Sequence, residues 1–254
     1  MEQYYTIFTY SLATIFALGW GSFATMAVYR LTHGEPWIGR RPFCPKCNHT
    51  LRFVDYVSLL SYFLYRGKCR YCKESYNYHH IYFMTELLIL IYFIVSFMLY
   101  DFSELFIINS GFIVAGVIWA MAYWAHQKSL GQMLIAMLFF ATIKRVYLDH
   151  TIYYFIYGGI LAFLLAAFCR FVYFALRGKT KQGRDFLEYK AEDRFANPSF
   201  IVVKLSIITG VMLGTEGLSI NLILFLTAIM LFVRKLKYSL PILANIMIIL
   251  MIVD

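Results

Sequence analysis

Long apolar runs separated by short polar stretches dominate the hydrophobic pattern of this chain. A run of about 20 apolar residues has the length of a helix that crosses a lipid bilayer. The runs lie at Thr6–Tyr29, Ile81–Tyr100, Leu105–Ala125, Leu130–Ile143, Ile152–Leu176, Ser199–Gly214, Ile220–Val233 and Leu240–Val253. The pattern therefore predicts an all-α, polytopic integral membrane protein with about eight transmembrane helices, of which the fourth, seventh and eighth are short.

Two longer polar stretches divide the chain. We expect a first transmembrane helix over residues 1–29, a polar loop over 30–80 and a multi-span membrane domain over 81–254 that contains a second polar loop, 178–198. The opening residues have no basic segment and no small-residue cleavage site. They therefore predict an uncleaved anchor rather than a removable signal peptide.

The composition agrees with a membrane protein and excludes other classes. Of the 254 residues, 61% are hydrophobic and 15% are charged, against about 45–50% and about 25% in soluble domains. A soluble core of this length cannot bury so much apolar surface. The same hydrophobicity excludes intrinsic disorder, and five cysteines are too few for a secreted disulfide scaffold.

The net charge of +9 is explained by membrane topology. Cytoplasmic loops of membrane proteins carry an excess of Lys and Arg. With the N-terminus outside, 19 of the 23 basic residues fall on the cytoplasmic side, and Lys144 and Arg145 fall outside. We therefore predict a multi-pass protein of the cytoplasmic membrane whose 30–80 loop is cytoplasmic. The lipid bilayer is an expected partner, and binding of nucleic acid is not expected.

Four of the five cysteines form two CxxC pairs within the 30–80 loop. Cys44 and Cys47 are followed, after 21 residues, by Cys69 and Cys72. This spacing is typical of a structural zinc site, in which two knuckles together present four thiolates to one tetrahedral ion. Disulfides are the weaker interpretation in a reducing cytoplasm, and a thioredoxin-like motif needs a βαβ setting that is missing here. Redox and lipid-attachment roles remain alternatives to the zinc knuckle.

The histidines of the loop and the fifth cysteine are not expected to bind the metal. Because four cysteines complete a closed site, we expect the histidines of the same loop to be surface residues: His33, His49, His79 and His80. Cys169 lies within an apolar run, where a packing role is expected.

The order of motifs in the N-terminal part resembles that of bacterial type IV prepilin leader peptidases. In that family a Gly-Ser-Phe helix end, here within Gly21–Leu31, leads into a cytoplasmic loop with two CxxC pairs. Leu59–Cys72 carries the second pair, and Glu86–Leu88 matches the Glu-Leu-Leu sequence near the start of the next span. The resemblance covers roughly residues 20–90.

The resemblance implies a function in type IV pilus, pseudopilus or DNA-uptake machinery. Members of the family cut the leader from pilin-like precursors at the cytoplasmic face, and many then methylate the new N-terminal amine with S-adenosylmethionine. Cleavage uses two aspartates near the cytoplasmic ends of two spans. One carboxylate activates water while its protonated neighbour polarises the carbonyl, since two close carboxylates do not both ionise.

The first of these aspartates is missing from this sequence. Its expected position falls on Trp124, or on Tyr123 with a shift of one residue. The sequence has no Asp or Glu between Glu104 and Asp149, and both of these acids fall on the outer side in the predicted topology.

The second aspartate is doubtful, because two registers compete for it. The register that we favour aligns Lys204 and Leu205 with the family's lysine and leucine and places Val202 at the aspartate. The other register retains Asp185 but leaves it in a polar loop before a span. A lone carboxylate can act as a general base, but it cannot form the proton-sharing pair.

Two hypotheses from different classes follow. The first is an enzyme, a divergent prepilin peptidase or N-methyltransferase in which Asp185 is the remaining candidate acid. The second is a degenerate family member that binds prepilins or a partner peptidase without cleaving. A membrane zinc-ribbon protein unrelated to pili is a distant third. For Glu86, the resemblance suggests a structural or methylation role, and a helix-end acid bonded to the neighbouring loop is the alternative.

Overall fold

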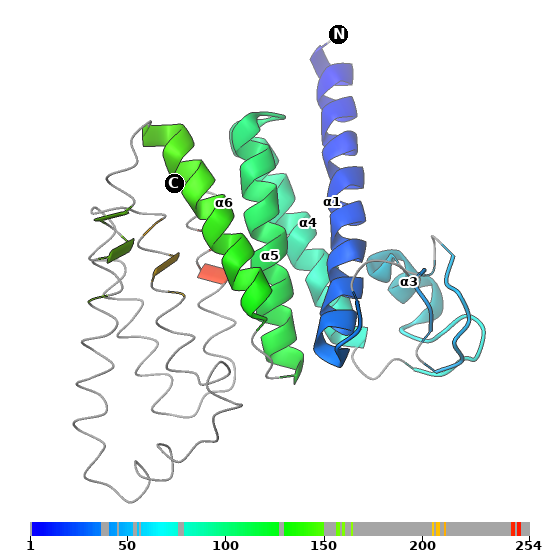
Figure 1. Cartoon of the computed structure of the whole chain (residues 1–254). Helices are drawn as coiled ribbons and strands as arrows, with labels where there is room; N and C mark the ends of the chain where they lie inside the picture. Colours follow the sequence, from blue (N-terminus) through cyan, green and yellow to red (C-terminus); the bar gives the residue numbers. More distant parts are fainter. Residues whose placement is uncertain are drawn as a thin grey trace, which may run out of the picture. The chain divides into compact units, whose positions relative to one another are not determined.

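The computed structural model describes the N-terminal three-fifths of the chain almost continuously. It covers residues 2–36, 41–44, 46–52, 57–75, 79–126 and 130–149, together with residue 55 and scattered positions between 156 and 249. The described part is helical, apart from two isolated β-bridges. Its helices are α1 (Glu2–His33), α3 (Ser58–Tyr65), α4 (His79–Tyr100), α5 (Glu104–His126) and α6 (Gly131–Asp149) (Figure 1).

Four of these helices are long and apolar enough to cross a membrane. They cover Gln3–His33, Ile81–Tyr100, Glu104–Ala125 and Gly131–Leu148. The first four predicted spans are therefore confirmed as helices. Three of the remaining predicted spans fall on residues that the structure describes only at scattered positions. The span Ile220–Val233 and the loop 178–198 lie outside the described residues, so the total of eight stays a prediction.

One helix is longer than the apolar run that predicts it. The run ends at Ile143, but α6 continues through Lys144 and Arg145 to Asp149. Lys144 is only 3% exposed. The reason is that an apolar-run criterion stops at the first charge, whereas helical hydrogen bonding continues into the apolar residues beyond it.

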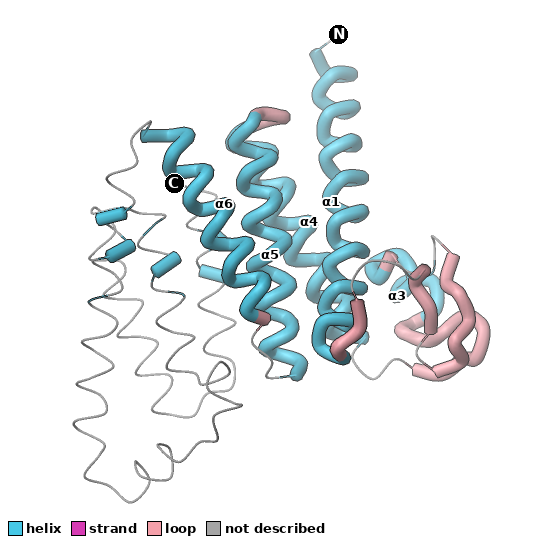
Figure 2. Tube along the Cα trace, viewed as in Figure 1, coloured by secondary structure: helices cyan, strands magenta, loops and turns pink. Residues whose placement is uncertain are grey.

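The first compact unit covers residues 1–128, where α1, α4 and α5 pack side by side (Figures 1 and 2). The helix α5 is the most enclosed of the spans, with 78% of its apolar window buried. One phenylalanine from each helix contacts the other two: Phe16, Phe93 and Phe106 have ring centroids 5.9–6.2 Å apart. Such mutual edge and tilted ring contacts fix the three helices against one another.

The second unit begins at Ser129 and contains α6. A Cβ added at Gly159 would lie 3.1 Å from Cγ2 of Val211, so two helical positions of this unit approach closely. Small residues permit such backbone approach between membrane helices.

A buried carboxyl group connects the polar loop to the membrane-spanning helices of the first unit. Glu86 of α4 is 1% exposed. Its Oε2 accepts a hydrogen bond from the backbone N–H of Leu59 at 2.6 Å, and its Oε1 accepts one from the Ser22 hydroxyl at 3.1 Å. Because Val57, the N-cap residue of α3, offers no side-chain cap, Glu86 supplies the acceptor that the helix start lacks. This group of contacts, the Glu86 junction, ties α1, α3 and α4 together.

Gly21 makes the Glu86 junction possible. A Cβ at this position would lie 3.1 Å from Cγ of Glu86 and 3.2 Å from its Cα. The second contact is to backbone, which cannot rotate away, so a side chain here forces α1 and α4 apart. The Gly-Ser pair of the sequence thus has a physical explanation: the glycine admits Glu86 and the serine donates to it.

We predict that Gly21→Ala destabilises the protein by about 1–3 kcal/mol, the usual cost of overpacking. Gly19→Ala is the matched control, because a Cβ at Gly19 meets nothing within 4 Å. That control should be neutral or stabilising, since alanine is the better helix former by about 1 kcal/mol. Thermal unfolding midpoints in detergent measure both. A Gly21→Ala midpoint equal to that of Gly19→Ala would show that the close approach is unimportant.

Candidate metal centre

The first CxxC pair lies in a tight turn closed by backbone hydrogen bonds. The N–H of Cys44 donates to the carbonyl of His49 at 2.9 Å, and the N–H of Asn48 donates to the carbonyl of Cys44 at 2.8 Å. An antiparallel bridge between Phe43 and Thr50 closes the base of the turn. Asn48 has a φ of 56°, a left-handed conformation that asparagine tolerates well.

The second pair repeats the same turn. The N–H of Cys69 donates to the carbonyl of Glu74 at 2.8 Å, the N–H of Lys73 donates to that of Cys69 at 3.0 Å, and Lys68 bridges Ser75. Lys73 stands at the left-handed position with a φ of 62°. The two turns, called here the first and second knuckles, are therefore two copies of one backbone design, each presenting a pair of thiols.

The two knuckles bring all four sulfurs together. The Sγ atoms of Cys44, Cys47, Cys69 and Cys72 lie within 4.8 Å of one another, and all four cysteines are free thiols. A tetrahedral zinc with bonds of about 2.3 Å needs sulfurs about 3.8 Å apart, so the donor set fits such an ion after a small contraction. Each knuckle contributes one buried cysteine, Cys44 or Cys69, and one nearer the surface.

The electrostatics of the cluster favour a cation at its centre. The backbone hydrogen bond with Glu74 lowers the pKa of the Cys72 thiol, but desolvation and the three neighbouring thiols outweigh it and raise the pKa to about 11. Desolvation likewise raises the pKa of Cys44. A divalent ion reverses this preference, because it stabilises the thiolate form of each ligand.

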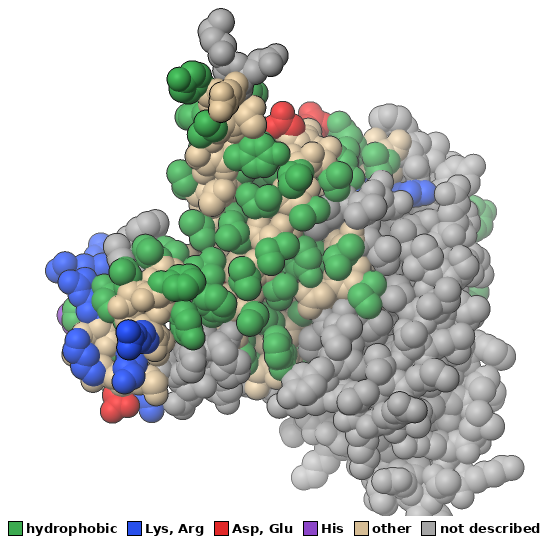
Figure 3. All heavy atoms as spheres, turned by 180° about the vertical axis from the view of Figure 1, so that it is seen from behind, with side chains coloured by type: hydrophobic (Ala, Val, Ile, Leu, Met, Phe, Trp, Pro, Cys, Tyr) green, Lys and Arg blue, Asp and Glu red, His purple; other side chains and the backbone are tan. Residues whose placement is uncertain are grey.

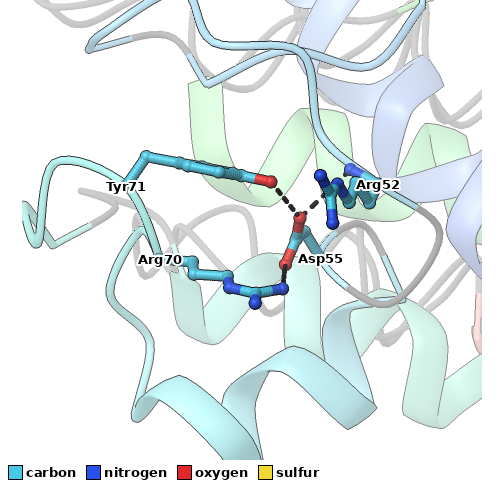
Figure 4. A network of polar contacts seen from close by, with 4 residues as sticks. All are labelled: Arg52, Asp55, Arg70 and Tyr71. Carbon is cyan, nitrogen blue, oxygen red and sulfur yellow. Dashed lines mark hydrogen bonds and ion pairs between the residues drawn. The ribbon is translucent and has the colours of Figure 1, made fainter.

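A polar network holds the second knuckle to the chain that precedes α3 (Figure 4). Oδ2 of the buried Asp55 accepts hydrogen bonds from the backbone N–H of Arg52 at 3.1 Å and from the Tyr71 hydroxyl at 3.2 Å. Arg70 lies 4.0 Å from its Oδ1. Tyr71 stands between the two cysteines of its pair, and its ring centroid lies 3.7 Å from that of His49 in the first knuckle. The two knuckles are thus connected by side chains as well as by their thiols.

The sequence prediction singled out the cysteines but missed Asp55 and Tyr71. The available signals were the position of Tyr71 inside a CxxC pair and the isolation of Asp55 among basic residues. Of the four loop histidines, His33 and His49 are exposed as expected, while the side chains of His79 and His80 lie outside the description. Within the described residues, the group able to hold a metal consists of the four cysteines alone.

The expected aspartate position carries aromatic side chains. Trp124 is half-buried near the end of α5, and the neighbouring Tyr123 is buried and stacks on Trp119 with centroids 5.6 Å apart. The other candidate positions, Asp185 and Val202, lie outside the described residues. Asp149 ends α6, about 27 Å from the start of that helix at Gly131.

The contacts of Glu86 agree with the prediction of a helix-end acid that is bonded to the neighbouring loop. The bond to the loop is the one from the backbone N–H of Leu59. The structure thus defines a class of protein, a helical membrane protein with a four-cysteine knuckle fixed to its first spans.

Comparison with known proteins finds relatives of the N-terminal part. Residues 15–100 match the bacterial peptidase A24 N-terminal domain. The chain is also 38% identical over 108 residues to a prepilin leader peptidase/N-methyltransferase of Vibrio cholerae, a match that covers 39% of this chain and 39% of that relative. No solved structure matches. The similarity therefore concerns the N-terminal part of the chain and less than half of the length of that relative.

The four-cysteine cluster predicts a defined metal stoichiometry. We expect the purified protein to bind one zinc ion per chain and Cys44→Ser to lose it, since a hydroxyl does not replace a buried thiolate ligand. Cys169→Ser, which alters the fifth cysteine outside both pairs, is the control and should keep its zinc. Elemental analysis of the purified variants measures this. Equal zinc content in the unaltered protein, Cys44→Ser and Cys169→Ser would show that the ion is bound outside the two knuckles.

The raised thiol pKa values predict how metal affinity depends on pH. At pH 7 a thiol with a pKa of about 11 is protonated, so binding the ion releases its proton. Affinity must therefore rise with pH, by about tenfold per pH unit for each proton released. Competition with a chelator at pH 6, 7 and 8 measures the slope. An affinity independent of pH would mean that the thiols are already ionised before the metal binds.

Proposed function

We propose that this protein acts on pilin-like precursors in the cytoplasmic membrane, through the N-terminal part that it shares with the prepilin peptidase family. The observation that carries the proposal is the connection of α3, the helix between the two knuckles, to α4 and α1. Glu86 of α4 makes this connection by hydrogen bonds to Leu59 and Ser22, within the matched residues 15–100. The matched relative is a prepilin leader peptidase/N-methyltransferase, and the match covers 39% of its length. Activity and substrate are carried over from that relative as part of this proposal.

The knuckle pair is proposed to hold zinc as a structural ion. Four cysteine ligands leave no open position for water or substrate, and such closed sites organise a fold rather than perform chemistry. In the proposed topology the N-terminus is outside and the knuckles face the cytoplasm, where reduced thiols persist. The excess of Lys and Arg in the loop supports this orientation.

Leader cleavage by a pair of aspartates is not part of the proposed function of this chain. The sequence carries no acid from residue 105 to residue 148, and Tyr123 and Trp124 occupy the end of α5 where the first aspartate is expected. We propose N-methylation of a leader-free pilin as the activity. In this reaction the neutral N-terminal amine would attack the methyl carbon of S-adenosylmethionine, and S-adenosylhomocysteine would leave with the electron pair of the broken C–S bond. The methylated ammonium product would then lose a proton, and the transfer would require no carboxylate pair.

Binding without chemistry is the second candidate function. It is favoured by the aromatic end of α5, where Tyr123 stacks on Trp119. A degenerate member of this kind holds precursors or a partner peptidase. If cleavage does occur, Asp185 is the remaining candidate acid.

Mass spectrometry of a pilin-like precursor co-expressed with this protein tests these functions. In a host without other leader peptidases, we expect the precursor to keep its full length. When the same host also supplies leader-free pilin, one added methyl group on its N-terminal amine identifies the methyltransferase. Unmodified pilin that co-purifies with the protein identifies the binding function.

Other outcomes would overturn the proposal. A shortened precursor in the first host would show that cleavage survives, and Asp185→Asn would then test the remaining acid. If the pilin is neither methylated nor co-purified with the protein, pilin-like precursors are excluded as its substrate class. The Cys44→Ser variant is compared with the unaltered protein in each host. It changes the candidate metal centre and leaves Asp185 in place, so it separates an effect of the knuckles from an effect of this acid.

A further inference from the structure

The short helix α3 presents a continuous apolar face to its surroundings. Leu60, Phe63 and Leu64 are 44%, 75% and 55% exposed. They occupy positions i, i+3 and i+4, which lie on one side of a helix. The opposite side is anchored, since Val57 is buried at the start of α3 and the Leu59 N–H is bonded to Glu86. The helix therefore has one fixed face and one exposed apolar face.

This exposed face lies at the level where a membrane span begins. The ring of Phe83, in the second turn of α4, lies 6.3 Å from that of Phe63 and 4.9 Å from that of Tyr62. The candidate span starts at Ile81. Since Phe83 belongs to the first turn of that span, the α3 side chains stand beside the bilayer boundary rather than far out in solvent.

Basic side chains surround the same region. Exposed Lys and Arg follow α3 directly and continue over both knuckles: Arg66, Lys68, Arg70, Lys73, Lys46 and Arg52. Figure 3 shows the hydrophobic surface of the spans continuing toward a group of Lys and Arg side chains. Of the two acids on the same stretch, Asp55 is buried and Glu74 is exposed.

We propose that α3 is an interfacial helix that seats the metal knuckles on the membrane surface, with anionic lipid as its occupant. The face formed by Leu60, Phe63 and Leu64 enters the acyl boundary of the leaflet in which α4 begins. The basic residues lie against the phosphate groups of that leaflet. Amphipathic helices with an apolar face and flanking Lys and Arg bind anionic membranes in this way.

Charge complementarity selects lipid over the other occupants. A second copy of this chain would bring the same basic residues against one another, which costs free energy. An anionic lipid surface offers negative charge and hydrocarbon together, at the depth that Phe83 marks. The proposal uses no precursor and no catalytic step, so it stands independently of the proposed function.

Site-specific photo-crosslinking tests the proposal on the full-length protein. p-Benzoylphenylalanine replaces Phe63, whose shape it extends, and the metal-loaded protein is placed in nanodiscs of phosphatidylcholine and phosphatidylglycerol. After irradiation, mass spectrometry is expected to show a lipid adduct at residue 63. The same photo-reactive residue at Glu74, an exposed position of the second knuckle outside the apolar face of α3, should give severalfold less lipid adduct.

The charge contribution is tested by lipid composition. Replacing phosphatidylglycerol with phosphatidylcholine should lower the adduct yield at residue 63 severalfold, and Arg66→Gln should weaken this dependence. An adduct to a second copy of the chain in place of lipid would overturn the proposal. So would the absence of any lipid adduct in protein that keeps its metal, or equal yields at residues 63 and 74.

Discussion

The hydrogen bonds of the buried Glu86 carboxyl group hold the N-terminal architecture together. Burying an acid among apolar spans is costly unless its oxygens are satisfied. Here one oxygen accepts from the backbone of α3 and the other from Ser22 of α1, while α4 carries the residue itself. A hydrogen bond of this kind contributes on the order of 0.5–1.5 kcal/mol, and leaving a buried polar group without its partner costs about 1–3 kcal/mol. The acid therefore converts three separate elements into one body, provided that Gly21 leaves room for it.

The candidate metal centre depends on two independent kinds of connection. The thiols converge because two similar turns face each other. Away from the sulfurs, Tyr71 of the second knuckle contacts His49 of the first, and Asp55 connects Tyr71 to the chain that precedes α3. The helix α3 lies between the two knuckles in the chain, and it contacts α4 through Tyr62 and Phe63. The position of the knuckles relative to the spans is therefore set by packing against α4 and not by the metal alone.

The matched N-terminal part has structural roles that do not depend on catalytic chemistry. Within residues 15–100, which match the bacterial peptidase A24 N-terminal domain, the Gly-Ser pair, the CxxC pairs and the glutamate of α4 have structural roles in the described contacts. None of those contacts needs a carboxylate at the end of α5, where aromatic residues stand instead. A shared scaffold thus leaves the reaction to be decided by the residues of the site itself.

The sequence by itself determined the properties that depend on composition and spacing. Membrane spans follow from the length of apolar runs, and the candidate metal ligands follow from two CxxC pairs, because both signals are local or strictly periodic. Tertiary structure alone decided which groups satisfy Glu86 and that Asp55 reaches Tyr71. Both features depend on contacts between distant segments. No run of neighbouring residues encodes either one.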